Sequence, residues 1–175
     1  MLPIDERRHL RDGARPDETH GGAGLVAVKV LGPRAAEVVV RAREVLDAVV
    51  THTPDGGGGW PDLATWRRVV PSFFVDACAP EQTPEETAAY LAWWRSLDAA
   101  DRAAAQRDLA WTFEQWIGWM EPDERQWWWW DATSVLPTYS RVFVVVDGWP
   151  SAVGSLRWLL RACGAGAVEV ADDLL

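Results

Sequence analysis

The pattern of hydrophobic residues predicts a strand followed by a helix near the start of the chain. In residues 25–31 (LVAVKVL), β-branched side chains alternate with smaller ones, as is typical of a half-buried strand. Gly32 and Pro33 end this strand. In residues 33–50, apolar side chains recur with a period close to 3.6 residues, which predicts an amphipathic helix. We therefore expect a βα unit here.

The C-terminal part of the chain predicts the same kind of unit. Residues 141–147 (RVFVVVD) form the clearest strand in the sequence. A helix is predicted from Pro150 or Ser151 to Cys163, and residues 167–170 predict a last strand. These segments give a strand, a helix and a strand in succession.

Residues 126–135 contain four consecutive tryptophans and are predicted to form a further strand. Aromatic side chains suit a pleated, half-buried surface, whereas four in a row would crowd every face of a helix. In a regular strand, Trp127 and Trp129 face one way and Trp128 and Trp130 the other.

The middle of the chain is predicted to be helical. Thr83 and Glu86 have the spacing of a capping box, so a helix begins there. A longer helix is predicted from Asp98 to about Met120. Residues 62–75 fit a short helix followed by a strand, and periodicity alone does not decide the matter.

This order of elements predicts an α+β fold. We expect a small open sheet of about four strands with ferredoxin-like character, carrying a Trp-rich two-helix insertion at residues 76–122. Residues 24–175 are predicted to form a single domain. Residues 1–23 are dense in charge, so we expect a flexible segment that buries little, around one short helix.

Composition bounds the class of protein. The chain has 175 residues, of which 49% are apolar, and this suits one domain. The N-terminal sequence lacks the apolar run of a signal peptide, and no apolar run approaches the roughly 20 residues that cross a bilayer. Cys78 and Cys163 are too few for a disulfide framework. We expect a cytoplasmic protein with reduced cysteines and no membrane partner.

Negative charge and tryptophan gather in the same part of the chain. The net charge is −9, and there are thirteen tryptophans. Residues 76–131 contain twelve acidic residues and four arginines, a net charge of −8, together with nine of the tryptophans. An ordinary nucleic-acid binder needs a basic stripe, so we expect no nucleic-acid partner.

Two interpretations of this central segment remain open. In one, each helix is amphipathic, with a solvent-exposed acidic face and a buried tryptophan face. In the other, some indole groups are exposed and form the centre of an interface, since adjacent pairs and runs of tryptophan cannot all enter one small core. The candidate binding residues are Trp93, Trp94, Trp111, Trp119, Trp128, Trp130, Asp131 and Trp149.

Three functional hypotheses follow. The preferred one is a non-catalytic binding protein whose acidic, Trp-rich centre holds a basic protein, as an inhibitor or a toxin-neutralising protein, because a negative field speeds association with a basic partner. The alternative is a small-molecule sensor or carrier with a cavity lined by Trp128, Trp130 and Trp149. The last is an enzyme using Asp147 or Asp131 as a general acid or base.

Other catalytic chemistry has little support in the sequence. Cys78 with His52 is the one conceivable nucleophile and base, and a buried inert thiol is the simpler interpretation. The chain has neither His-Glu-x-x-His nor Cys-x-x-Cys, so we expect no metal and no cofactor. The glycines at 56–59 are not followed by Lys-Ser/Thr, which argues against a phosphate-binding loop.

Overall fold

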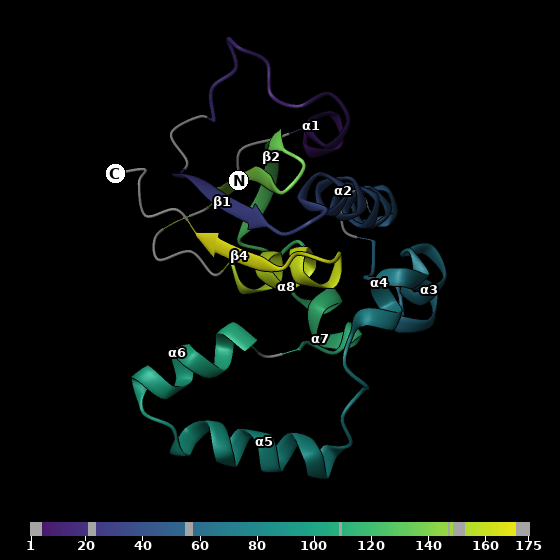
Figure 1. The fold of residues 1–175 in the computed structure, drawn as a ribbon. Helices are drawn as coiled ribbons and strands as arrows, with labels where there is room; N and C mark the ends of the chain where they lie inside the picture. Colours follow the sequence, from purple (N-terminus) through teal and green to yellow (C-terminus); the bar gives the residue numbers. More distant parts are fainter. Residues whose placement is uncertain are drawn as a thin grey trace.

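A four-stranded antiparallel sheet organises the chain (Figure 1). The structure is a computed structural model that describes residues 5–20, 24–54, 58–108, 110–146, 148 and 153–170. The sheet has the order β2-β3-β1-β4. Its strands are β1 (Gly24–Leu31), β2 (Trp127–Leu136), β3 (Tyr139–Val146) and β4 (Ala167–Val170).

Two helices connect the strands as the sequence predicts. Helix α2 (Ala35–His52) follows β1, and α8 (Gly154–Ala162) joins β3 to β4. Because β3 lies between β1 and β2, and β1 lies between β3 and β4, each of the two connections skips one strand, which is the split βαβ arrangement of ferredoxin-like folds. The predicted α+β fold with a small open sheet is therefore confirmed.

The main core lies between the sheet and these two helices. Alternate valines of β1 and β3 are buried together with the apolar faces of α2 and α8. Trp127 and Trp129 of β2 join this core, and both are fully buried. The indole Nε1 of Trp127 donates to Ser155 Oγ at 2.9 Å, which links β2 to the first turn of α8. The apolar face of the sheet and the apolar faces of α2 and α8 thus form one buried layer.

Between α2 and β2, the described residues form five helices. They are α3 (Leu63–Val69), α4 (Ser72–Ala77), α5 (Pro84–Ser96), α6 (Ala99–Asp108) and α7 (Phe113–Gly118). The capping box of Thr83 and Glu86 starts α5 as predicted. Residues 62–75 contain two helices and no strand, because Asp62 caps α3 and Pro71 separates it from α4.

The prediction of one helix from Asp98 to Met120 is wrong. Helix α6 ends at Asp108, and α7 begins after a second capping box formed by Thr112 and Gln115. In this box the Thr112 side chain accepts from the backbone N–H of Gln115 at 3.1 Å, and the Gln115 side chain accepts from Thr112 N at 3.2 Å. These bonds satisfy the donors of a new helix start.

Helix α1 (Glu6–Asp12) packs against β2 and α2. Its residues Glu6, His9 and Leu10 are buried, so the expectation that this charged segment buries little is wrong for α1. The reason is that its polar side chains have partners in the fold. Glu6 accepts from the backbone N–H of Trp129 at 2.7 Å, for example. Burial of polar groups is tolerated when they are hydrogen-bonded in this way.

The tryptophan run forms a strand as predicted, but the strand is not regular. Trp128 pairs with Val145 and Trp129 with Val144, and then the register shifts so that Asp131 pairs with Phe143. Trp130 has no partner on β3 at this β-bulge, so the predicted alternation of Trp128 and Trp130 ends there.

Candidate functional site

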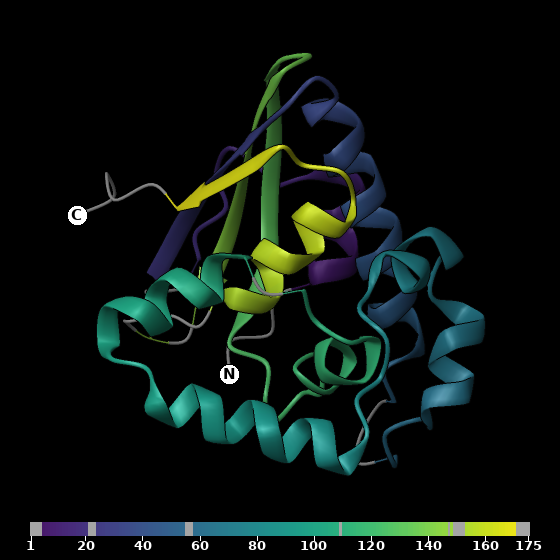
Figure 2. The same cartoon turned by 60° about the horizontal axis from the view of Figure 1, so that its bottom comes forward.

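Helices α5 and α6, residues 84–108, form a projection that we call the helical arm. Figures 1 and 2 show both helices, in teal, at the periphery of the molecule and away from the sheet. No residue of α5 is buried. Among the described residues, neither arm helix packs closely against another element. Its apolar side chains therefore have little of the fold to contact.

An aromatic cluster lies on one face of α5. Tyr90, Trp93 and Trp94 occupy positions i, i+3 and i+4, and their ring centroids are 5.6 to 6.3 Å apart. Partial burial raises the pKa of the Tyr90 hydroxyl. Trp93 nevertheless remains 46% exposed, and the neighbouring Leu91 is exposed as well. We call these three aromatic residues the α5 aromatic cluster.

Arg102 of α6 connects the two helices of the arm. Its guanidinium donates to the backbone carbonyls of Trp94 and Arg95, both at 3.2 Å. These carbonyls belong to the last turn of α5, where carbonyls lack their regular i+4 donors, and the Trp94 carbonyl also accepts from the backbone N–H of Leu97 at 3.4 Å. Arg102 thus caps the end of α5 and forms no ion pair with a carboxylate of the described residues.

The negative charge of the central segment is largely uncompensated. Within the described part of residues 76–131, Glu81 is the one carboxylate that forms an ion pair, to Arg67 at 2.7 Å. Near the arm, Glu86 is held in the α5 capping box, and Asp98 accepts from the backbone N–H of Asp101 at 2.8 Å. The α5 aromatic cluster therefore lies on an arm with unpaired negative charge at its helix starts.

Trp111 and Trp119 form a second, separate pair. Their ring centroids are 6.3 Å apart in an edge-to-face arrangement. Trp111 is partly buried against the core and lies beside Gly154, whereas Trp119 is 39% exposed. The prediction that some indole groups stay exposed is thus confirmed for Trp93 and Trp119.

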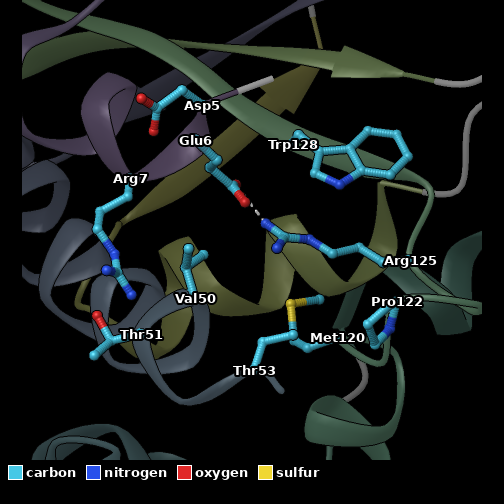
Figure 3. Close-up of a pocket in the computed structure, with 10 residues that line it drawn as sticks. All are labelled: Asp5, Glu6, Arg7, Val50, Thr51, Thr53, Met120, Pro122, Arg125 and Trp128. Carbon is cyan, nitrogen blue, oxygen red and sulfur yellow. Dashed lines mark hydrogen bonds and ion pairs between the residues drawn. The ribbon is translucent and has the colours of Figure 1, made fainter. Parts of the chain in front are cut away.

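The remaining predicted site residues are dispersed. Trp128 lines a cavity beside Arg125 (Figure 3). Trp130 is instead buried, with its ring 4.4 Å from that of His9 in an edge-to-face contact. Asp131 accepts from the backbone N–H of Ala132 at 2.8 Å and lies close to Gly13. Asp147 and Trp149 lie outside the described residues.

The structure brings together Glu6 and Arg125, which sequence reasoning did not single out. Glu6 Oε1 accepts from Arg125 Nη2 at 2.5 Å, and both side chains are 6% exposed. Arg125 is one of only four arginines in the acidic segment. An arginine isolated among carboxylates is a candidate for a buried ion pair, and this is the sequence signal that points to Arg125.

Cys78 and His52 have different hydrogen-bond partners. The Cys78 thiol donates to the carbonyl of Phe74 at 3.3 Å, and the His52 ring contacts the carbonyl of Ala48 at 2.8 Å. Burial raises the pKa of Cys78 to about 11. A catalytic thiol needs the opposite shift, because the thiolate is the nucleophile. The geometry favours the inert interpretation of this cysteine.

The function of these residues is indicated neither by a metal-binding group nor by similarity to a known protein. Among the described residues, no group of three or more His, Cys, Asp or Glu side chains could hold a metal ion. None of the helices in this part of the chain has both the length and the apolar sequence of a membrane span. No protein-family model, curated protein or solved structure matches this chain.

Proposed function

We propose that this is a non-catalytic binding protein and that its helical arm docks a basic protein partner. The observation that carries this proposal is the α5 aromatic cluster, which lies on a helix without a single buried residue. Ordering an exposed helix with two tryptophans gains little from the fold itself. A partner that covers the cluster would supply the missing apolar contact.

The chemistry of the arm suits the centre of an interface. Tryptophan and tyrosine side chains are common energetic anchors because they bury a large area with few rotatable bonds. The ring contacts within the cluster hold Trp93 in place before binding, which lowers the entropy cost of docking. Trp93 is thus the expected anchor.

Charge favours a basic partner. Carboxylates such as Glu85 and Asp101 lie in the first turns of α5 and α6 and have no cation of their own among the described residues. A partner's lysines and arginines would be attracted by this field, and an arginine can also stack on an exposed indole. Inhibition or neutralisation of an enzyme with a basic active surface is the concrete form of this role.

The test compares matched exposed apolar residues. Candidate partners are captured at low salt from a lysate of the source cells, purified, and titrated against the wild-type protein and the Trp93→Ala variant. We expect a basic partner whose dissociation constant rises at least about tenfold with Trp93→Ala, as for an interface anchor. Val135→Ala is the control, because Val135 is 53% exposed but lies on β2.

Charge is tested separately with Glu85→Gln combined with Asp101→Asn. We expect this variant to associate more slowly, with a weaker dependence of the rate on salt, while its dissociation changes less. If every captured partner binds the Trp93→Ala variant as tightly as the wild-type protein, the arm is not the docking surface. If the partners are acidic, the assigned charge preference is wrong.

A further inference from the structure

A cavity of about 500 Å³ lies where α1, the end of α2, the loop after α7 and the start of β2 meet (Figure 3). Its size falls within the range of about 300 to 1,000 Å³ that is common for small-molecule sites. Trp128, Met120 and Val50 provide apolar lining, and Arg7 and Arg125 provide positive charge. The cavity does not involve the helical arm.

Arg125 lines this cavity and has a buried donor without a partner among the described residues. Figure 3 shows its side chain extending toward Glu6 among the lining residues. Arg125 Nη2 donates to Glu6, but the buried Nε has no acceptor among the described residues. A guanidinium has five N–H donors, so this ion pair uses only part of what it offers.

Arg7 supplies a second cation to the cavity. It lines the cavity next to Glu6 in the sequence, and no carboxylate of the described residues pairs with it. The two acidic side chains of the lining are already engaged. Glu6 accepts from Arg125 and from the backbone N–H of Trp129, and Asp5 caps α1 by accepting from Arg8 N at 3.1 Å. The lining thus carries two carboxylates and two guanidinium groups, and Arg7 is the one of these four groups that has no hydrogen-bond or ion-pair partner among the described residues.

We propose that this cavity binds a small aromatic carboxylate. The ring of the ligand packs against Trp128, Met120 and Val50, since flat apolar groups stack favourably on an indole. The carboxylate is held by Arg7, because a guanidinium and a carboxylate form strong charge-assisted hydrogen bonds. The volume accommodates one or two fused rings.

Three naphthalene compounds with the same ring system and an anionic, a neutral or a cationic substituent test this assignment. The full-length protein is titrated calorimetrically with 2-naphthoate, with the neutral 2-naphthamide and with the cationic 2-naphthylmethylamine. We expect 2-naphthoate to bind at least about tenfold more tightly than the amide, as a charge-assisted contact implies. The amine should bind most weakly.

Variants locate the binding site. Arg7→Gln should raise the dissociation constant of 2-naphthoate to near that of the amide and leave the amide unchanged. Trp128→Leu should weaken both compounds, and Trp128→Phe, which keeps a ring, should restore much of the affinity. Arg34→Gln is the control, since Arg34 is exposed and does not line the cavity. Trp93→Ala should also have no effect.

Several outcomes overturn the proposal. Absence of binding by all three compounds removes the ligand site. Binding of 2-naphthoate that neither Arg7→Gln nor Trp128→Leu changes places the compound elsewhere on the protein. Equal affinity for the carboxylate and the amide, or tighter binding of the amine, removes the carboxylate assignment. None of these outcomes bears on the helical arm, which is tested with different variants.

Discussion

Glu6 and Arg125 form a buried ion pair between residues 119 positions apart in the sequence. Glu6 Oε1 also accepts from the backbone N–H of Trp129 at 2.7 Å. The Arg125 guanidinium lies over the ring of Trp127, 5.0 Å from its centroid. One carboxylate thus fastens α1 both to the loop before β2 and to the tryptophan run itself.

Removing the Glu6 carboxylate should therefore be costly. Glu6→Ala leaves the Arg125 guanidinium buried without its counter-charge, and we expect a loss of about 3 to 5 kcal/mol in the free energy of unfolding, measured in urea. Arg11→Ala removes the exposed pair with Asp47 and should cost less than about 1 kcal/mol. Equal losses in the two variants would contradict the structural role of the buried pair.

Acid should weaken the fold through Glu18. The hydrogen bond with His9 at 2.8 Å, helped by the backbone N–H of Arg15, lowers the pKa of Glu18 from 4.5 to about 2. A carboxyl whose pKa is lower in the folded state stabilises the fold above its unfolded pKa, and this contribution is lost as the pH falls from about 5 toward 2.

Unfolding free energies measured from pH 7 to pH 2 check this. Glu18→Gln should be less stable than the wild-type protein at neutral pH, and the difference should shrink as the pH approaches 2. The control Glu37→Gln, in an exposed pair with Arg34, should follow the wild-type curve. A constant difference between Glu18→Gln and the wild-type protein would rule out the proposed linkage.

Local patterns predicted most of the sheet, because they report on single elements. The β-branched residues of β1 and β3 and the Thr83 capping box needed no tertiary information. The capping box of Thr112 and Gln115 is an equally local signal for a helix start, and it contradicts the predicted long helix. The apolar stripe of residues 98–120 predicts one helix, although a helix start lies within it.

The features that sequence patterns did not predict depend on tertiary contacts. The burial of α1 depends on Arg125, far along the chain, and its high charge alone argued for exposure. Trp130 leaves the strand alternation because of a bulge, which an aromatic run does not reveal. The arm was predictable as acidic and Trp-rich, but the absence of packing against α5 emerged only from the fold.

Both cysteines should react slowly in the folded protein. Burial raises the pKa of Cys78 to about 11 and that of Cys163 to about 12, so the thiolate fraction near pH 8 is small. We expect iodoacetamide to modify Cys163 more slowly than Cys78, and both far more slowly than in urea-unfolded protein. Peptide mass spectrometry measures each site. Modification of native Cys163 at the unfolded rate would contradict its burial.

Trp116 and Trp93 should respond oppositely to truncation. Trp116 is fully buried, packs against Phe74 with ring centroids 4.4 Å apart, and donates to the carbonyl of Ser155 at 3.0 Å. Trp116→Ala should therefore cost about 3 to 5 kcal/mol in the free energy of unfolding, through a cavity and an unpaired carbonyl.

Trp93→Ala removes an indole that the fold leaves half exposed, so we expect a loss below about 1 kcal/mol. Urea denaturation followed by far-ultraviolet circular dichroism measures both variants without relying on tryptophan fluorescence. The comparison separates the two roles that tryptophan plays in the acidic segment, because α7 carries its indole into the core while α5 does not. A large loss with Trp93→Ala would mean that the α5 aromatic cluster serves the stability of the arm, and Trp93 would then no longer be a candidate anchor for a partner.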